Sequence, residues 1–168
     1  MKIIFPKVLA CLLLMWSATG CSKDSAEPQE EFFVKAQKDG QPWDKTGEGY
    51  FAMGKREFYV FSPDTIPVTT TEVLQLSFAL PKKQVLSSVQ ALPAEWKLLI
   101  GGDGITDSYA STDGTGLPSI QITKLDTVQR IVEGRFEAVL RRKAVYTQQT
   151  ELMRFTNGSF RVRYKELP

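Results

Sequence analysis

The sequence predicts an all-β fold, a single β-sandwich-like domain of about ten short, mostly antiparallel strands over residues 32–168. Apolar and polar residues alternate in short runs throughout this region, which is typical of strands with one buried face. The runs show no repeat of fixed period. Dipeptides that favour tight turns separate many of them. Examples are Asp39-Gly40, Asp113-Gly114 and Asn157-Gly158.

Each expected strand is an alternating or β-branched run that ends at turn-forming residues. In chain order the expected strands are Phe32–Gln37, Tyr50–Met53, Glu57–Phe61, Val73–Leu80, Trp96–Ile100, Ser108–Ser111, Ser119–Leu125, Val132–Arg141, Glu151–Thr156 and Ser159–Tyr164. Only Lys82–Leu92, which lies between Pro81 and Pro93, could hold a helical turn or two.

The last two strands are expected to form a hairpin, because Asn157-Gly158 suits a two-residue type I′ turn. That register sets Phe155 opposite Phe160 on an apolar face that also carries Met153, Val162 and Tyr164.

The other face of this hairpin would place Arg154 opposite Arg161, with Arg163 nearby. Like charges in direct opposition are destabilising, so a partner is expected. The arginines could bind an anionic ligand such as a sugar acid, a phosphate or a polyanionic glycan. We favour the simpler interpretation, which is pairing with Glu133 and Glu137 on the outward face of the preceding strand.

Residues 1–20 have the organisation of a secretion signal. Lys2 and Lys7 precede an apolar run, Val8–Trp16, that is about half the length a membrane-spanning helix needs. Small residues then lead to Cys21, and the pattern resembles a lipobox, with Ala18 where leucine is usual. We therefore expect Cys21 to carry the lipid of a mature lipoprotein. An ordinary signal cleavage that leaves a free thiol is the alternative.

Residues 21–31 are expected to be the lipidated cysteine and a flexible tether, because the segment is polar and lacks apolar periodicity. Two or three acyl chains bind a bilayer firmly, so the membrane partner would be reached through the N-terminal lipid. Ser22 directly after the cysteine is similar to lipoproteins sorted to the outer membrane, on either its periplasmic face or the cell surface.

Composition restricts the possible chemistry. Without Lys2 and Lys7 the chain would carry 19 basic and 19 acidic side chains, so no long-range field would attract nucleic acid. The chain has no histidine, which removes the commonest general base and zinc ligand. Its only cysteines are Cys11 and Cys21, so the domain has neither disulfide nor thiol nucleophile. No cofactor and no metal site are expected.

Several motifs together resemble a family of β-rich Bacteroidota lipoproteins without an assigned function. The run Phe33–Trp43 is similar to the opening of that family. Ile122-Thr123-Lys124-Leu125-Asp126, followed by Gly134-Arg135-Phe136, looks like its I-T-x-x-D…G-x-F pair, with Arg135 where threonine is usual. The closing T-N-G-x-F-x-V strand of that family is matched by Thr156-Asn157-Gly158-Ser159-Phe160-Arg161-Val162. The resemblance implies a compact β-sandwich-like fold and no active site.

Two further kinds of site were considered. Asp103–Asp107 and Asp113–Gly116 offer oxygens to Ca²⁺, but they lack the spacing and closing glutamate of an EF-hand loop, so turns are the favoured interpretation. Among the aromatic residues, adjacent Phe58 and Tyr59 must face opposite sides of a strand. Core packing is the favoured interpretation for Trp43, Trp96, Tyr50, Phe58 and Tyr59, since aromatic residues often anchor sandwich cores. If one of these rings is exposed and stacks on a sugar, Trp43, after Pro42, is the first choice.

The sequence therefore favours a lipid-anchored, non-enzymatic binding or assembly module of the cell envelope, with a glycan or an envelope protein as candidate partner. The candidate ligand contacts are Trp43, Arg154, Arg161 and Arg163. The alternatives are a glycan-binding module and a carboxylate-dependent glycan-processing enzyme, which would use two acids facing each other across a cleft.

Overall fold

The computed structural model describes residues 32–63, 70–80, 89–101, 104–112, 114–143 and 150–168. The expected signal, lipidation site and tether lie outside the described residues, as does most of the candidate helical segment. In the described part the chain forms ten strands and no helix, so the all-β prediction is confirmed. The strands are β1 (Phe33–Lys38), β2 (Gln41–Thr46), β3 (Glu48–Ala52), β4 (Glu57–Phe61), β5 (Thr70–Ala79), β6 (Gln90–Ile100), β7 (Gly104–Ala110), β8 (Ser119–Asp126), β9 (Ile131–Arg142) and β10 (Leu152–Leu167).

All ten strands belong to one sheet, in the order β2-β1-β10-β3-β4-β5-β6-β7-β9-β8. An additional pairing between β9 and β10 closes the sheet on itself. Strands β1 and β3 follow one another along the same edge of β10, and the pairing of β3 with β10 is the only parallel one among the described pairings. Closure leaves β2 and β8 as the edge strands.

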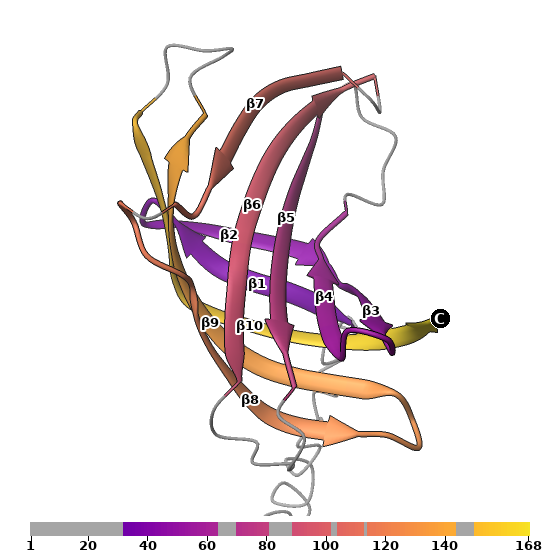
Figure 1. Ribbon diagram of the computed structural model, residues 1–168. Coiled ribbons are helices and arrows are strands. Elements are labelled where there is room, and N and C mark those ends of the chain that lie inside the picture. Colours follow the sequence, from indigo (N-terminus) through magenta and orange to yellow (C-terminus); the bar gives the residue numbers. More distant parts are fainter. Residues whose placement is uncertain (1–31, 64–69, 81–88, 102–103, 113, 144–149) are drawn as a thin grey trace, which may run out of the picture.

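The closed sheet has two facing layers. In Figure 1 strands β5, β6 and β7 cross over the layer that contains β1, β9 and β10. Strands that cross steeply are typical of sheets that turn back on themselves through bulges. No helix in the described residues has the length and apolar character that a membrane crossing requires.

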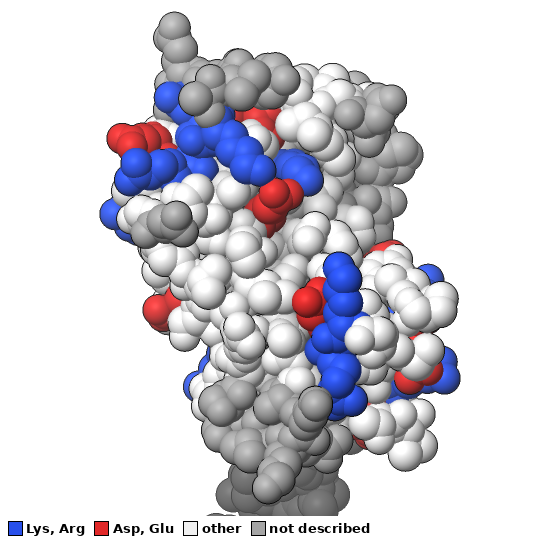
Figure 2. Space-filling view, in the orientation of Figure 1, with Lys and Arg blue, Asp and Glu red and all other residues white. Residues whose placement is uncertain are grey.

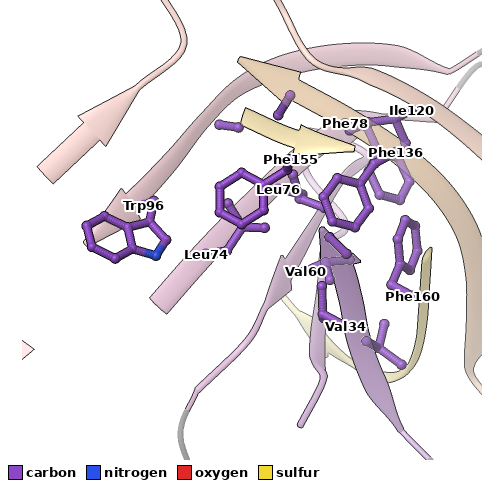
Figure 3. Packing of buried hydrophobic residues seen from close by; sticks show 14 of the residues in the cluster. Val34, Val60, Leu74, Leu76, Phe78, Trp96, Ile120, Phe136, Phe155 and Phe160 are labelled. Atoms are coloured by element: carbon purple, nitrogen blue, oxygen red, sulfur yellow. The ribbon is translucent and has the colours of Figure 1, made fainter. Parts of the chain in front are cut away.

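The core fills the space between these layers. Phe58 and Val60 of β4, Leu76 of β5, and Phe155 and Val162 of β10 are each no more than 1% exposed. Figure 3 shows Phe78, Phe136 and Phe160 toward one end of the cluster and Trp96 at the other. As expected, Phe58 and Tyr59 face opposite sides of β4, with Phe58 buried in the core and Tyr59 only partly buried. Burial of these large side chains is the main stabilising contribution to the fold.

The expected C-terminal hairpin is wrong. Residues 152–167 form one continuous strand, and Asn157-Gly158 lies at a bulge where the pairing with β9 shifts between Phe155 and Gly158. Only Asn157 has positive φ, +52°, whereas a type I′ turn needs it at both central residues. Before the bulge the inward positions are 153 and 155, and after it they are 158, 160, 162 and 164. The residues expected on the apolar face are therefore correct, but the expected pairing of Phe155 with Phe160 is wrong.

Strand β2 was not expected. It follows β1 through Asp39-Gly40, whose φ angles of +50° and +80° are those of a type I′ turn. Pro42 has no N–H to donate, which an edge strand tolerates. Because β2 buries only Trp43, its sequence shows little alternation.

The two G-x-F motifs of the sequence form one structural unit. Gly134 lies opposite Phe160, and Gly158 lies opposite Phe136, on adjacent strands β9 and β10. A Cβ atom on Gly134 would lie 2.5 Å from the Phe160 ring, and one on Gly158 would lie 2.6 Å from the Phe136 ring. Each phenyl ring therefore covers the glycine of the opposing strand, so both positions require glycine.

Candidate functional site

A polar groove lies across three neighbouring strands. It encloses about 570 Å³, and it runs over β8, β9 and the bulge of β10. We call it the outer groove, because most of its side chains belong to the outward face of the sheet. Its lining residues are Ser119, Gln121, Arg135, Phe136, Glu137, Asn157, Gly158 and Ser159.

The strand register explains how these residues meet. Arg135 on β9 lies between Gln121 on β8 and Ser159 on β10, which makes one row across the sheet. Glu137, two residues further along β9, pairs with Ser119 and forms the next row. The bulge adds Asn157, which is exposed. Beneath them the Phe136 side chain is buried and covers Gly158.

The polar side chains that line the outer groove have no interaction partner in the part of the chain that the structure describes. Among the residues that the structure describes, no hydrogen bond or ion pair is made by the side chains of Ser119, Gln121, Arg135, Glu137, Asn157 and Ser159. Their hydrogen-bonding capacity is therefore available to water or to a ligand.

The neighbouring row on the same face differs. Lys124, Glu133 and Arg161 lie side by side across β8, β9 and β10. Glu133 Oε1 is 3.4 Å from Arg161 Nη1 and 3.8 Å from Lys124 Nζ. The expected pairing of Arg161 with Glu133 is thus confirmed, and it neutralises the centre of the proposed anion-binding face. The expected pairing with Glu137 is wrong, because Glu137 makes no ion pair within the described residues.

The other two candidate arginines do not join it. Arg154 lies opposite Val139, not opposite Arg161, because the hairpin does not exist. The Arg163 guanidinium carbon lies 4.9 Å from the centre of the Phe32 ring, a cation–π distance. The three arginines therefore do not form a common ligand site in the described residues.

Oppositely charged side chains also occur together elsewhere on the surface. Figure 2 shows one face of the molecule, on which Lys and Arg form two separate groups with Asp or Glu within each. One such contact joins Glu95 to both Lys97 and Lys143, at 2.8 and 2.9 Å. Hydrogen bonds from Lys97 and then from Lys143 hold the pKa of Glu95 below its ordinary value. Glu95 therefore remains ionised, unlike a general acid, whose pKa is raised.

No family model, curated protein or solved structure matches this chain. The site must therefore be interpreted from its own geometry.

Trp43, the first choice for an exposed ring, is buried, in agreement with the core packing that was favoured for the aromatic residues. The side chain points into the core, its residue is 7% exposed, and it contacts Phe155 edge to face at 5.3 Å between ring centres. Its indole Nε1 donates a hydrogen bond of 2.6 Å to Glu72 Oε2. Buried indoles usually find such a partner, and here the partner fixes the ring as part of the core.

An inward ion pair was missed. Lys38 of β1 reaches Glu72 of β5 at 2.7 Å, and its ammonium lies 4.6 Å from the centre of the Trp96 ring. The alternation Val34, Ala36, Lys38 already places the lysine on the inward face, and that was the available signal. The pair links the two layers where the apolar core ends.

The calcium candidates receive no support from the described residues. Asp103 and Asp113 lie outside them, and Asp107 is fully buried. Nowhere in the described ranges do three potential ligands among His, Cys, Asp and Glu gather into a metal-binding group.

Proposed function

We propose that this chain is a lipid-anchored outer-membrane lipoprotein that works as a non-enzymatic binding or assembly module, with the outer groove as its binding face. The lipid on Cys21 would hold the protein at the membrane, so the folded domain needs no membrane-binding surface of its own. A glycan or an envelope protein is the proposed partner. The resemblance to β-rich Bacteroidota lipoproteins agrees with this proposal.

The observation that carries the binding role is the set of polar side chains in the outer groove for which the described part of the chain offers no hydrogen-bond or ion-pair partner. A structural surface can pair its charges locally, as the adjacent Lys124–Glu133–Arg161 row does at 3.8 and 3.4 Å, even though Glu133 Oε1 and Arg161 Nε make no hydrogen bond within the described residues. In the outer groove, by contrast, Arg135 and Glu137 on the same strand have no ion-pair partner among the residues that the structure places. In ligand sites, a few convergent polar groups in a hollow fix the orientation of the ligand and provide specificity.

The same lining favours binding over glycoside hydrolysis. Hydrolases of the common two-acid type need a pair of carboxyl groups about 5–9 Å apart. Among the described residues that line the outer groove, Glu137 is the only carboxylic acid. The chain also has no histidine to replace the missing acid.

The anchor is tested with the full-length chain and its Cys21→Ser variant. We expect the unaltered protein in the membrane fraction, with mass spectrometry showing acyl groups on Cys21, and we expect the variant in the soluble fraction. An unmodified thiol at Cys21, or equal membrane retention of the variant, would contradict the lipoprotein assignment.

The binding face is tested by filling the groove. Ser119 and Thr123 are both exposed outward positions on β8, but only Ser119 lines the groove. The lipoprotein in detergent is screened against glycans and envelope peptides. A ligand of the outer groove should lose affinity for the Ser119→Tyr variant and keep it for the Thr123→Tyr variant. If no ligand distinguishes these two variants, the proposed binding face is wrong.

A further inference from the structure

We infer that the ligand of the outer groove is an uncharged carbohydrate, and that Arg135 and Glu137 bind it as a complementary pair. This inference rests on the proposed function, because it names the class of molecule that the binding face would accept. The argument uses the charge balance of the lining, the kinds of hydrogen-bonding groups present and their spacing.

The charge balance disfavours ions. Arg135 and Glu137 supply one positive and one negative charge, and the other polar lining side chains are neutral. They stand two residues apart on the same face of β9, which corresponds to roughly 7 Å along a strand. An anion drawn to Arg135 would be repelled by Glu137, and a cation drawn to Glu137 would be repelled by Arg135. A ligand without net charge avoids both costs.

The hydrogen-bonding groups match hydroxyls. Arginine only donates and an ionised glutamate only accepts, whereas the serine hydroxyls and the amides of Gln121 and Asn157 do both. Each sugar hydroxyl is also both a donor and an acceptor, so one sugar can donate to Glu137 and accept from Arg135. Bonds to these two charged groups are stronger than bonds between neutral groups.

The groove also sets the expected strength of binding. Its single aromatic residue, Phe136, is 2% exposed and covers Gly158 from the inside, so it offers no ring to stack on. Without stacking, binding depends on hydrogen bonds that replace those made to water, whose net contribution is small. We therefore expect dissociation constants in the millimolar range.

The experiment uses the full-length lipoprotein in detergent and isothermal titration calorimetry. The neutral probes are maltotriose, cellotriose and xylotriose, the acidic probe is trigalacturonate, and inorganic phosphate reports simple anion binding. The variants are Arg135→Gln and Glu137→Gln, with Arg154→Gln as the matched control. Arg154 is an exposed arginine on β10 that lies outside the groove lining.

We expect a neutral trisaccharide to bind and both groove variants to weaken it by about tenfold, since each loses a charge-assisted hydrogen bond. The Arg154→Gln variant should bind like the unaltered protein, and added salt should change the affinity little. Unchanged thermal unfolding would show that all three variants remain folded.

A charged ligand would give a different pattern. For an anion, Arg135→Gln should weaken binding and Glu137→Gln should strengthen it, and salt should weaken both interactions. That pattern, or binding of trigalacturonate or phosphate in preference to all neutral probes, would overturn the inference. If such an acidic ligand is still lost on Ser119→Tyr, the binding face itself stands. Absence of binding by every neutral probe would also overturn the inference.

Discussion

Two dipeptides with the same turn chemistry adopt different structures in this molecule. Asp39-Gly40 joins β1 to β2 as a two-residue turn, with φ of +50° and +80°. Asn157-Gly158 lies inside β10, and only Asn157 has positive φ, +52°. Both pairs are strong local signals for a hairpin, yet only the first makes one.

The neighbouring strands account for the difference. Strand β10 pairs with β9 on one edge and with β1 on the other, and both pairings continue past the bulge. A turn at Asn157 would remove the central strand between them and break two ladders of hydrogen bonds. At Asp39-Gly40 the turn adds β2 to a free edge of β1 instead. Whether such a dipeptide forms a hairpin turn or stays within a strand therefore depends on how many strand pairings each of the two structures preserves.

The largest expected difference between the two regions comes from their glycines. A Cβ at Gly158 would lie 2.6 Å from both the Phe136 ring and the Phe136 carbonyl oxygen, whereas a Cβ at Gly40 meets nothing within 4 Å. We expect Gly158→Ala to lower the free energy of unfolding by about 3 kcal/mol through overpacking. Gly40→Ala should cost about 1 kcal/mol, for the left-handed backbone alone.

Urea unfolding of both variants measures these costs. If Gly158→Ala were no more destabilising than Gly40→Ala, Gly158 would not be packed under Phe136, and a turn at that position would again have to be considered.

The next effect concerns Asp39, whose side chain links the two regions. Its Oδ1 accepts a hydrogen bond of 2.8 Å from the backbone N–H of Arg154, close to the bulge. Asp39→Ala loses this bond and puts alanine at positive φ, so we expect a loss of about 2 kcal/mol. Asp39→Asn keeps an acceptor oxygen and tolerates the left-handed backbone, so it should cost about 0.5 kcal/mol or less. If both variants lost the same free energy of unfolding, the side-chain hydrogen bond and the backbone preference of Asp39 would contribute nothing to stability.

Much of the fold follows from local pattern. Strand β4 is found at Glu57–Phe61, the same bounds that the alternation predicts. On β9 the expected outward positions Glu133 and Glu137 alternate with buried residues, namely Val132, Phe136, Ala138 and Leu140. The bulge was missed because one extra residue within a strand shifts the alternation of buried and exposed positions in the same way as a two-residue hairpin turn does. In both cases Phe155 and Phe160 share the apolar face.

The candidate site was less accessible to prediction. The sequence places Glu133 and Glu137 on the outward face of one strand, but it does not give the register of β8 and β10 beside it. The outer groove needs that register to bring Gln121 and Ser159 next to Arg135. Trp43 was named as the first choice for an exposed ring because a strand with a single buried residue has no alternation to show which side faces the core.

The smallest predicted effect tests Asn157 itself. Asparagine tolerates the left-handed region better than other residues with a Cβ, and no hydrogen bond of its side chain occurs in the described residues. Asn157→Ala should therefore cost about 1 kcal/mol, while Asn157→Gly should be nearly neutral. Denaturant unfolding again provides the measurement. The pair isolates the backbone conformation, because both substitutions remove the same amide. If the two variants were equally stable, residue 157 would not require a positive φ angle. Strand β10 could then continue through this position with the φ angle of a regular strand.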